Sequence, residues 1–109
     1  MNPMQVGHLS LDDAEIAAFC EKWGIAELAV FGSVLRDDFG PESDVDFLVT
    51  WKPGASPATY FRLFELRDEL SRIVRRPADL AEKQLLERSY NEFRRQAILS
   101  SATRVYAAA

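Results

Sequence analysis

The chain has 109 residues, of which 48% are apolar and 28% are charged, the composition of an ordinary globular protein. This length predicts one domain over residues 1–109 and a hydrophobic core that needs neither a disulfide nor a structural metal. The net charge of −4 disfavours a broad, sequence-independent grip on nucleic acid, so we expect no direct nucleic-acid contact.

The charge is divided unevenly along the chain. Residues 1–57 carry a net charge of −7, whereas residues 58–109 carry +3. The acidic half is suited to attract cations, and the basic half is suited to face an anionic ligand or partner.

The chain has one cysteine, Cys20, and one histidine, His8, which together exclude an intramolecular disulfide and a multi-cysteine or histidine-based zinc site. Cys20 falls on the apolar side of a predicted helix, so we interpret it as a small buried side chain rather than a nucleophile. No apolar run approaches the length of a membrane span, so we expect no membrane partner and a reducing, cytoplasmic location.

Residues 1–9 suggest a loose lead-in, and His8 within them receives no role. Ser10 is a candidate N-cap because acidic residues follow it directly. A helix is predicted from there to Gly24, which suits the helix C-terminus. Its buried face is predicted to contain Ile16, Phe19, Cys20 and Trp23, which are spaced three and four residues apart.

The remaining elements alternate between strands and helices. Strands are predicted at residues 26–31 and 44–51, a loop at 52–57, a helix at 58–74 and a weaker strand at 77–81. A last helix begins near Lys83 and is predicted to extend through Val105. This helix is expected either to complete the core or to form an interface between copies of the chain, and the second alternative would make the protein a homo-oligomer. The order α, β, β, α, β, α predicts an α/β (α+β) fold with a small mixed sheet flanked by helices.

Gly32 and Ser33 follow a predicted strand directly. Glycine lets the backbone approach a ligand closely, and the free N–H groups of a following turn, with the Ser33 hydroxyl, suit phosphate. Such a pair is more often a simple turn.

Asp44 and Asp46 open the second predicted strand. Because side chains alternate along a strand, both carboxylates point to one face, while Val45 points into the core. Two close carboxylates repel each other unless a cation lies between them, and Mg²⁺ prefers such oxygens. A solvated acidic strand end is the simpler alternative. However, the apolar run after Asp46 indicates a buried strand, and ligand-binding sites in α/β sheets tend to lie at the ends of such strands.

Asp79 lies in a short apolar run near Arg75 and Arg76. It is a candidate third metal ligand from a neighbouring strand. A helix N-cap or a partner for either arginine are the alternatives.

Together, these residues resemble the signature of the polymerase-β-like nucleotidyltransferase superfamily, in which Gly-Ser is followed by Asp-x-Asp. Residues 31–49 are especially similar to the minimal nucleotidyltransferases, small proteins that are commonly antitoxins to HEPN-domain RNase toxins. Asp79 matches the third carboxylate of that family, and the resemblance extends from about Leu28 to Val105. The positions in register are Arg36, Pro41, Ser43, Asp44 and Asp46. Leu35 and Asp37 depart from the family pattern, and the extra acid at Asp37 is expected to weaken nucleotide binding.

The resemblance implies a fold and a reaction. The fold is the polymerase-β-like one, and the reaction is transfer of AMP from ATP to a hydroxyl. Asp44, Asp46 and Asp79 would be the catalytic residues and the ligands of two Mg²⁺ ions, with Asp79 also a candidate proton acceptor. The nucleotide phosphates would be bound by Gly32, Ser33, Arg36 and Ser43. For Arg36, pairing with Asp37 or Asp38 is an equal alternative.

The resemblance also implies an acceptor, the hydroxyl of a tyrosine on a cognate HEPN toxin, which makes the chain the antitoxin of a toxin–antitoxin pair. A small-molecule acceptor fits less well, because larger relatives hold such acceptors with an extra helical domain that 109 residues leave no room for. A different class of function is an inactive or weakly active binding module that neutralises the toxin by steric occlusion.

Overall fold

The structure, a computed structural model, describes residues 3–36, 39–40, 43–57 and 59–108. The predictions for Asp37, Asp38 and Pro41, and the expected helix start at Ala58, lie outside the described residues.

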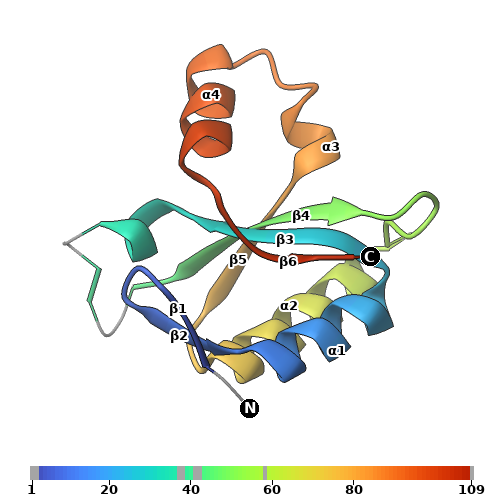
Figure 1. Cartoon of the computed structure of the whole chain (residues 1–109). Helices are drawn as coiled ribbons and strands as arrows, with labels where there is room; N and C mark the ends of the chain where they lie inside the picture. Colours follow the sequence, from blue (N-terminus) through green and yellow to red (C-terminus); the bar gives the residue numbers. More distant parts are fainter. Residues whose placement is uncertain (1–2, 37–38, 41–42, 58, 109) are drawn as a thin grey trace.

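A four-stranded sheet forms the centre of the fold (Figure 1). Its strands lie in the order β5 (Ala78–Glu82), β4 (Val45–Trp51), β3 (Ile25–Phe31) and β6 (Thr103–Ala107). β3 is antiparallel to β4 and β6, whereas β5 is parallel to β4. The predicted mixed sheet is therefore confirmed.

Helices cover both faces of this sheet (Figure 1). The helices α1 (Asp13–Trp23) and α2 (Tyr60–Val74) lie on one face, and the shorter α3 (Lys83–Leu86) and α4 (Glu92–Ser101) lie on the other. No helix in the described part of the chain is long and apolar enough to cross a membrane.

The alternation of side chains along β4 separates two cores. Val45, Phe47 and Val49 are fully buried in the larger core with α1 and α2. Leu48 points to the opposite face and packs in a smaller cluster with Ile98 of α4. Asp46 shares that second face, so the strand that anchors the core also presents a carboxylate beneath α4.

The first helix begins and ends at defined caps. The carboxylate of Asp12 accepts hydrogen bonds from the backbone N–H groups of Ala14 and Glu15, so Asp12 is the N-cap and the prediction of Ser10 was wrong. Gly24 ends the helix with a left-handed φ of 70°, as predicted. Cys20 is buried, as predicted.

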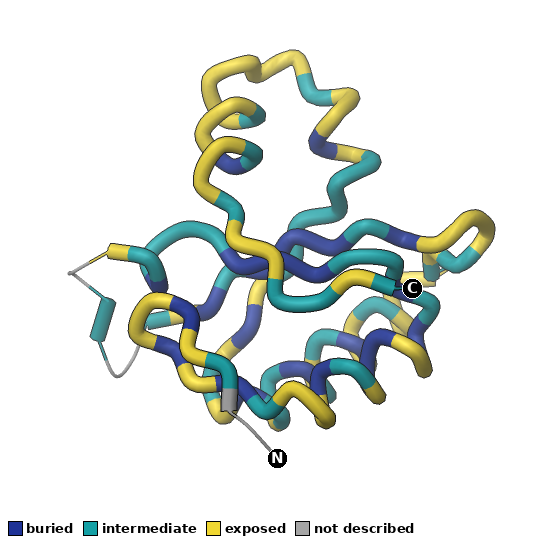
Figure 2. The backbone as a smooth tube through the Cα atoms, in the orientation of Figure 1, coloured by how far each residue is buried: buried dark blue, intermediate teal, exposed yellow. Residues whose placement is uncertain are grey.

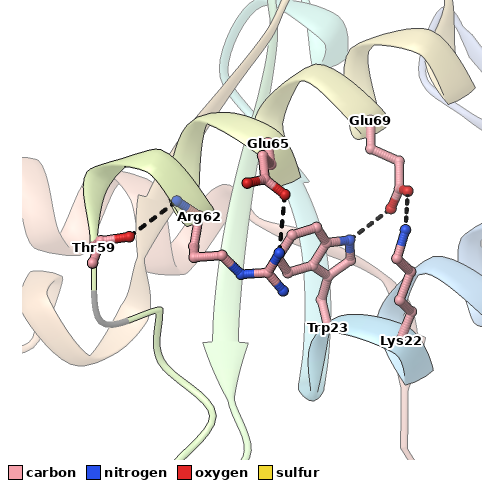
Figure 3. A network of polar contacts seen from close by, with 6 residues as sticks. All are labelled: Lys22, Trp23, Thr59, Arg62, Glu65 and Glu69. Atoms are coloured by element: carbon pink, nitrogen blue, oxygen red, sulfur yellow. Dashed lines mark hydrogen bonds and ion pairs between the residues drawn. The ribbon is translucent and has the colours of Figure 1, made fainter.

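A polar network fastens α1 to α2 (Figure 3). The carboxylate of Glu69 pairs with Lys22 and accepts a 2.6 Å hydrogen bond from the indole N–H of Trp23. The guanidinium carbon of Arg62 lies 4.4 Å from the centre of a Trp23 ring, a cation–π contact. Arg62 therefore takes part in the packing of α1 against α2.

Three strands were missed by the sequence analysis. The predicted lead-in at residues 1–9 is wrong for the part described, because β1 (Pro3–Val6) pairs with β2 (Leu9–Asp12) as an antiparallel hairpin. The prediction that the last helix includes Val105 is also wrong, because α4 ends at Ser101 and β6 follows. β6 supplies the hydrogen-bonding partner that the outer edge of β3 requires.

Candidate active site

Asp46 and Asp79 lie side by side on neighbouring strands. They are register partners in the parallel pair of β4 and β5, so their side chains leave the same face of the sheet. Asp79 is not a helix N-cap, since it lies within β5. The structure thus brings together two carboxylates that are 33 positions apart in the sequence.

Asp44 completes an acidic cluster at the start of β4. Burial raises the pKa of Asp46 above its ordinary value, and the negative charges of Asp79 and Asp44 raise it further, whereas Arg36 and Arg94 oppose them. The cluster therefore favours a positive charge between its oxygens, which is the chemistry of a Mg²⁺ site. Within the described residues, no three side chains of His, Cys, Asp or Glu already form a metal-holding group.

Gly32 makes room for the Asp46 carboxylate. It begins the short 3-10 turn η1 (Gly32–Leu35) with a positive φ of 79°. A methyl group at this position would lie 2.4 Å from Oδ2 of Asp46, closer than atoms approach one another. Only glycine lets the turn and the carboxylate occupy this space together.

Ser33 and Arg36 lie at the same end of the sheet. The Ser33 hydroxyl donates a long, 3.5 Å hydrogen bond to the backbone carbonyl of Asp44, so the turn is tied to the start of β4. Arg36 follows η1, and its charge acts on Asp46 to lower that carboxyl's pKa.

Ser43 shapes the segment before the acidic cluster. Its hydroxyl accepts a 3.0 Å hydrogen bond from the backbone N–H of Gly40. This bond ties Gly40 to Ser43 just before Asp44, so Ser43 has a structural task at this end of the sheet.

Arg76 braces this same segment, a task that sequence reasoning missed. Its guanidinium donates to the backbone carbonyl of Gly40 at 2.8 Å and lies 4.4 Å from the ring centre of Phe39. The ring of His8 stacks on Phe39 at 6.2 Å. Arg76 and His8 therefore both pack against Phe39.

A cavity of about 280 Å³ opens beside the carboxylates. Arg94 of α4 lines it together with Asp46 and Asp79, so positive and negative side chains share one small space. Sequence reasoning missed Arg94, because nothing near it in the chain connects it to residues 44–46. The remaining lining residues are Phe31, Leu80, Ala81 and Ile98.

Three comparisons identify what this arrangement belongs to. The family model of the nucleotidyltransferase domain matches residues 16–105. A protein of Methanocaldococcus jannaschii named "Putative protein adenylyltransferase MJ0128" is 33% identical over 70 residues, which are 64% of this chain and 68% of that protein.

Two solved structures share the fold. One, a toxin–antitoxin with AMP-PNP, matches with a TM-score of 0.65 at 18% identity, over 90% of this chain and 75% of the other. The second is a tri-AMPylated Shewanella oneidensis HEPN toxin in complex with an MNT antitoxin. It matches with a TM-score of 0.57 at 17% identity, over 88% of this chain and 70% of the other. With the fold, the paired carboxylates and the family match in agreement, the chain belongs to the nucleotidyltransferase-domain family and is a nucleotidyltransferase.

Proposed function

We propose that this chain transfers AMP from ATP to a tyrosine hydroxyl of a HEPN-domain toxin in the cytoplasm and thereby acts as its antitoxin. The observation that carries the proposal is the pairing of Asp46 with Asp79 in register, beside a glycine that leaves space for the Asp46 carboxylate. Two comparisons support the acceptor class. The M. jannaschii relative is named as a protein adenylyltransferase, and one structure of the same fold is an MNT antitoxin bound to an AMPylated HEPN toxin.

In the proposed reaction, the acceptor hydroxyl oxygen forms a bond to the α-phosphorus of ATP. The bond from that phosphorus to the bridging oxygen breaks on the opposite side, and pyrophosphate leaves with its electron pair. Asp79 accepts the hydroxyl proton. Asp44, Asp46 and Asp79 would hold Mg²⁺, which supplies positive charge to the triphosphate and lowers the pKa of the attacking hydroxyl.

Two arginines suit the triphosphate. Arg94 lines the cavity beside the carboxylates, and Arg36 lies near enough to act on Asp46. A guanidinium presents paired N–H donors that match phosphate oxygens, so these side chains can orient the phosphates while the carboxylates take the metal.

One observation favours the alternative function, neutralisation by occlusion without turnover. Among the described residues, the carboxylates do not form a ready-made three-ligand metal site. Neutralisation by occlusion needs no bound metal.

The test incubates the chain with α-³²P-labelled ATP, Mg²⁺ and the product of the neighbouring gene, tested as the HEPN-domain partner. The test variant is Asp44→Asn/Asp46→Asn, and the matched control is Asp68→Asn, which removes an exposed carboxylate of α2. We expect label on a tyrosine of the HEPN protein with the wild type and the control but not with the double variant. Neutralisation by all three proteins, without label from any of the four nucleotides, would refute the transferase and establish occlusion.

A further inference from the structure

The large apolar side chains that remain exposed are confined to two short segments. In the described chain they are Tyr60, Phe61 and Phe64 at the start of α2, and Leu85, Tyr90 and Phe93 around α3 and α4. Figure 2 shows that the segment joining α3 to α4 is exposed along most of its length. Such grouping, in contrast to scattered single residues, is typical of a surface that another molecule covers. Of these side chains, Tyr60 and Leu85 line a common groove.

A groove of about 740 Å³ connects the two segments. Tyr60 contributes to it from the first turn of α2, and Leu85 contributes from α3; their exposed fractions are 80% and 59%. The loop after β4 forms the third side. This groove is distinct from the cavity at the carboxylates, with which it shares no lining residue.

The floor of the groove is held rigid by side-chain hydrogen bonds. The indole N–H of Trp51 donates to Glu82 at 2.7 Å. The side chain of Gln84 donates to the backbone carbonyl of Trp51 at 3.2 Å. A floor that is already ordered loses little entropy when a partner docks on it.

The charges of the groove favour an acidic occupant. Lys52 and Arg88 lie along it, and the one carboxylate among its lining residues, Glu82, is engaged by Trp51. A second copy docking through the same groove would place these cations against their own copies, which costs free energy. A flat bilayer would not fill a concave site, whereas a protein segment with apolar side chains and flanking carboxylates fits both its shape and its charge.

We propose that this groove is the docking site for the acceptor protein, through an apolar segment flanked by acidic residues. This inference rests on the proposed function for the identity of its partner. β5, the edge strand of the sheet, lies between the groove and the reaction centre. Asp79 and Glu82 are three residues apart on it, a span of about 10 Å, and their side chains leave opposite faces of the sheet. A protein that is seated in the groove and extends around this edge therefore comes within reach of the carboxylates.

The test measures binding to the HEPN-domain protein by calorimetry, without nucleotide, for the full chain and three variants. Tyr60→Ser/Leu85→Ser removes the two apolar anchors. Phe61→Ser is the matched control, since Phe61 is 81% exposed on the same helix but does not line the groove. The third variant is the carboxylate pair Asp44→Asn/Asp46→Asn.

We expect the groove variant to bind at least about 30-fold more weakly, the size of effect typical of central interface anchors. Phe61→Ser and the carboxylate variant should bind within about twofold of the wild type, and binding should weaken between 50 mM and 500 mM NaCl, because exposed charges are screened. All the substituted side chains except Asp46 are exposed, so equal melting temperatures would show that folding is intact.

Equal binding by the wild type and the groove variant would overturn the inference, as would the absence of any complex with the wild type. Co-sedimentation of the chain with phosphatidylserine vesicles, lost in the groove variant, would also overturn it in favour of a membrane surface. Tight, groove-dependent binding without any transfer of label would leave the docking site standing and refute the proposed transferase instead.

Discussion

Replacing Gly32 by alanine is expected to affect metal and nucleotide binding much more than the stability of the fold. The new methyl group would lie 2.4 Å from Oδ2 of Asp46, so the carboxylate must move by about 1 Å to reach ordinary contact. That oxygen is the free end of a side chain, and rotating it away costs little stability. The left-handed backbone, with φ of 79°, adds about 1 kcal/mol for any residue with a Cβ atom.

Gly54 provides the matched control. It has nearly the same φ, 76°, but a methyl group there would meet nothing within 4 Å. Gly32→Ala and Gly54→Ala should therefore lose similar stability, about 1 kcal/mol each, in urea unfolding. Only Gly32→Ala should weaken the binding of Mg²⁺ with α,β-methylene-ATP, an analogue that resists cleavage. We expect a loss of 10- to 100-fold, the range seen when groups that orient metal ligands are disturbed. Equal affinity of the two variants in calorimetry would refute the argument that Gly32 serves Asp46.

Three further predictions concern the fold. Burial alone would raise the pKa of Glu69, but hydrogen bonds from Lys22 and Trp23 and nearby positive charges outweigh it and lower that pKa. The Glu69 carboxylate should therefore stabilise the folded protein at pH values above the ordinary carboxyl pKa. This contribution should be lost as the pH falls through the lowered pKa that Glu69 has in the folded protein. In urea unfolding, the wild type should have a free energy of unfolding about 1 kcal/mol higher than that of Glu69→Gln at pH 7, and this difference should vanish towards pH 3. A difference that stays constant with pH would contradict the prediction. Burial raises the pKa of Cys20 to about 12, so at pH 8 the thiol of the folded chain stays protonated and unreactive. A thiol reagent should therefore modify Cys20 only as fast as the chain unfolds, and rapid labelling of the folded chain would contradict the burial. Phe47→Leu should lower the free energy of unfolding by about 1–2 kcal/mol. It should leave Mg²⁺ binding unchanged, because the side chains of Phe47 and Asp46 leave opposite faces of β4. Weakened Mg²⁺ binding in calorimetry would contradict this separation.

The acidic cluster could be anticipated from sequence because its signals are local. An Asp-x-Asp at the mouth of an apolar strand predicts two carboxylates on one face, and a second apolar run with Asp79 predicts a neighbouring strand. The structure places Asp46 and Asp79 as partners in register, as that pattern implied.

The elements that were missed depend on contacts distant in sequence. β6 has the composition of a short strand, but the sequence pattern predicts a helix through Val105, and only the open edge of β3 decides between the two. Arg94 and Arg76 carry no local pattern, because their neighbours are distant in sequence: β4 and β5 for Arg94, and Phe39 and Gly40 for Arg76. The β1–β2 hairpin does carry a local signal, because apolar residues alternate with other residues on both sides of Gly7.

That hairpin bears on where this protein can be trimmed. It lies before residue 16, at which the family match begins. Nevertheless, Val6, Leu9 and Leu11 are buried, and the backbone N–H of His8 at its tip donates to the carbonyl of Val34 in η1 at 3.2 Å. A recombinant fragment that begins at the family boundary would lose three core side chains and the hydrogen bond that holds η1 after Gly32. A stable, active fragment of this enzyme must therefore begin upstream of the segment by which its family is recognised.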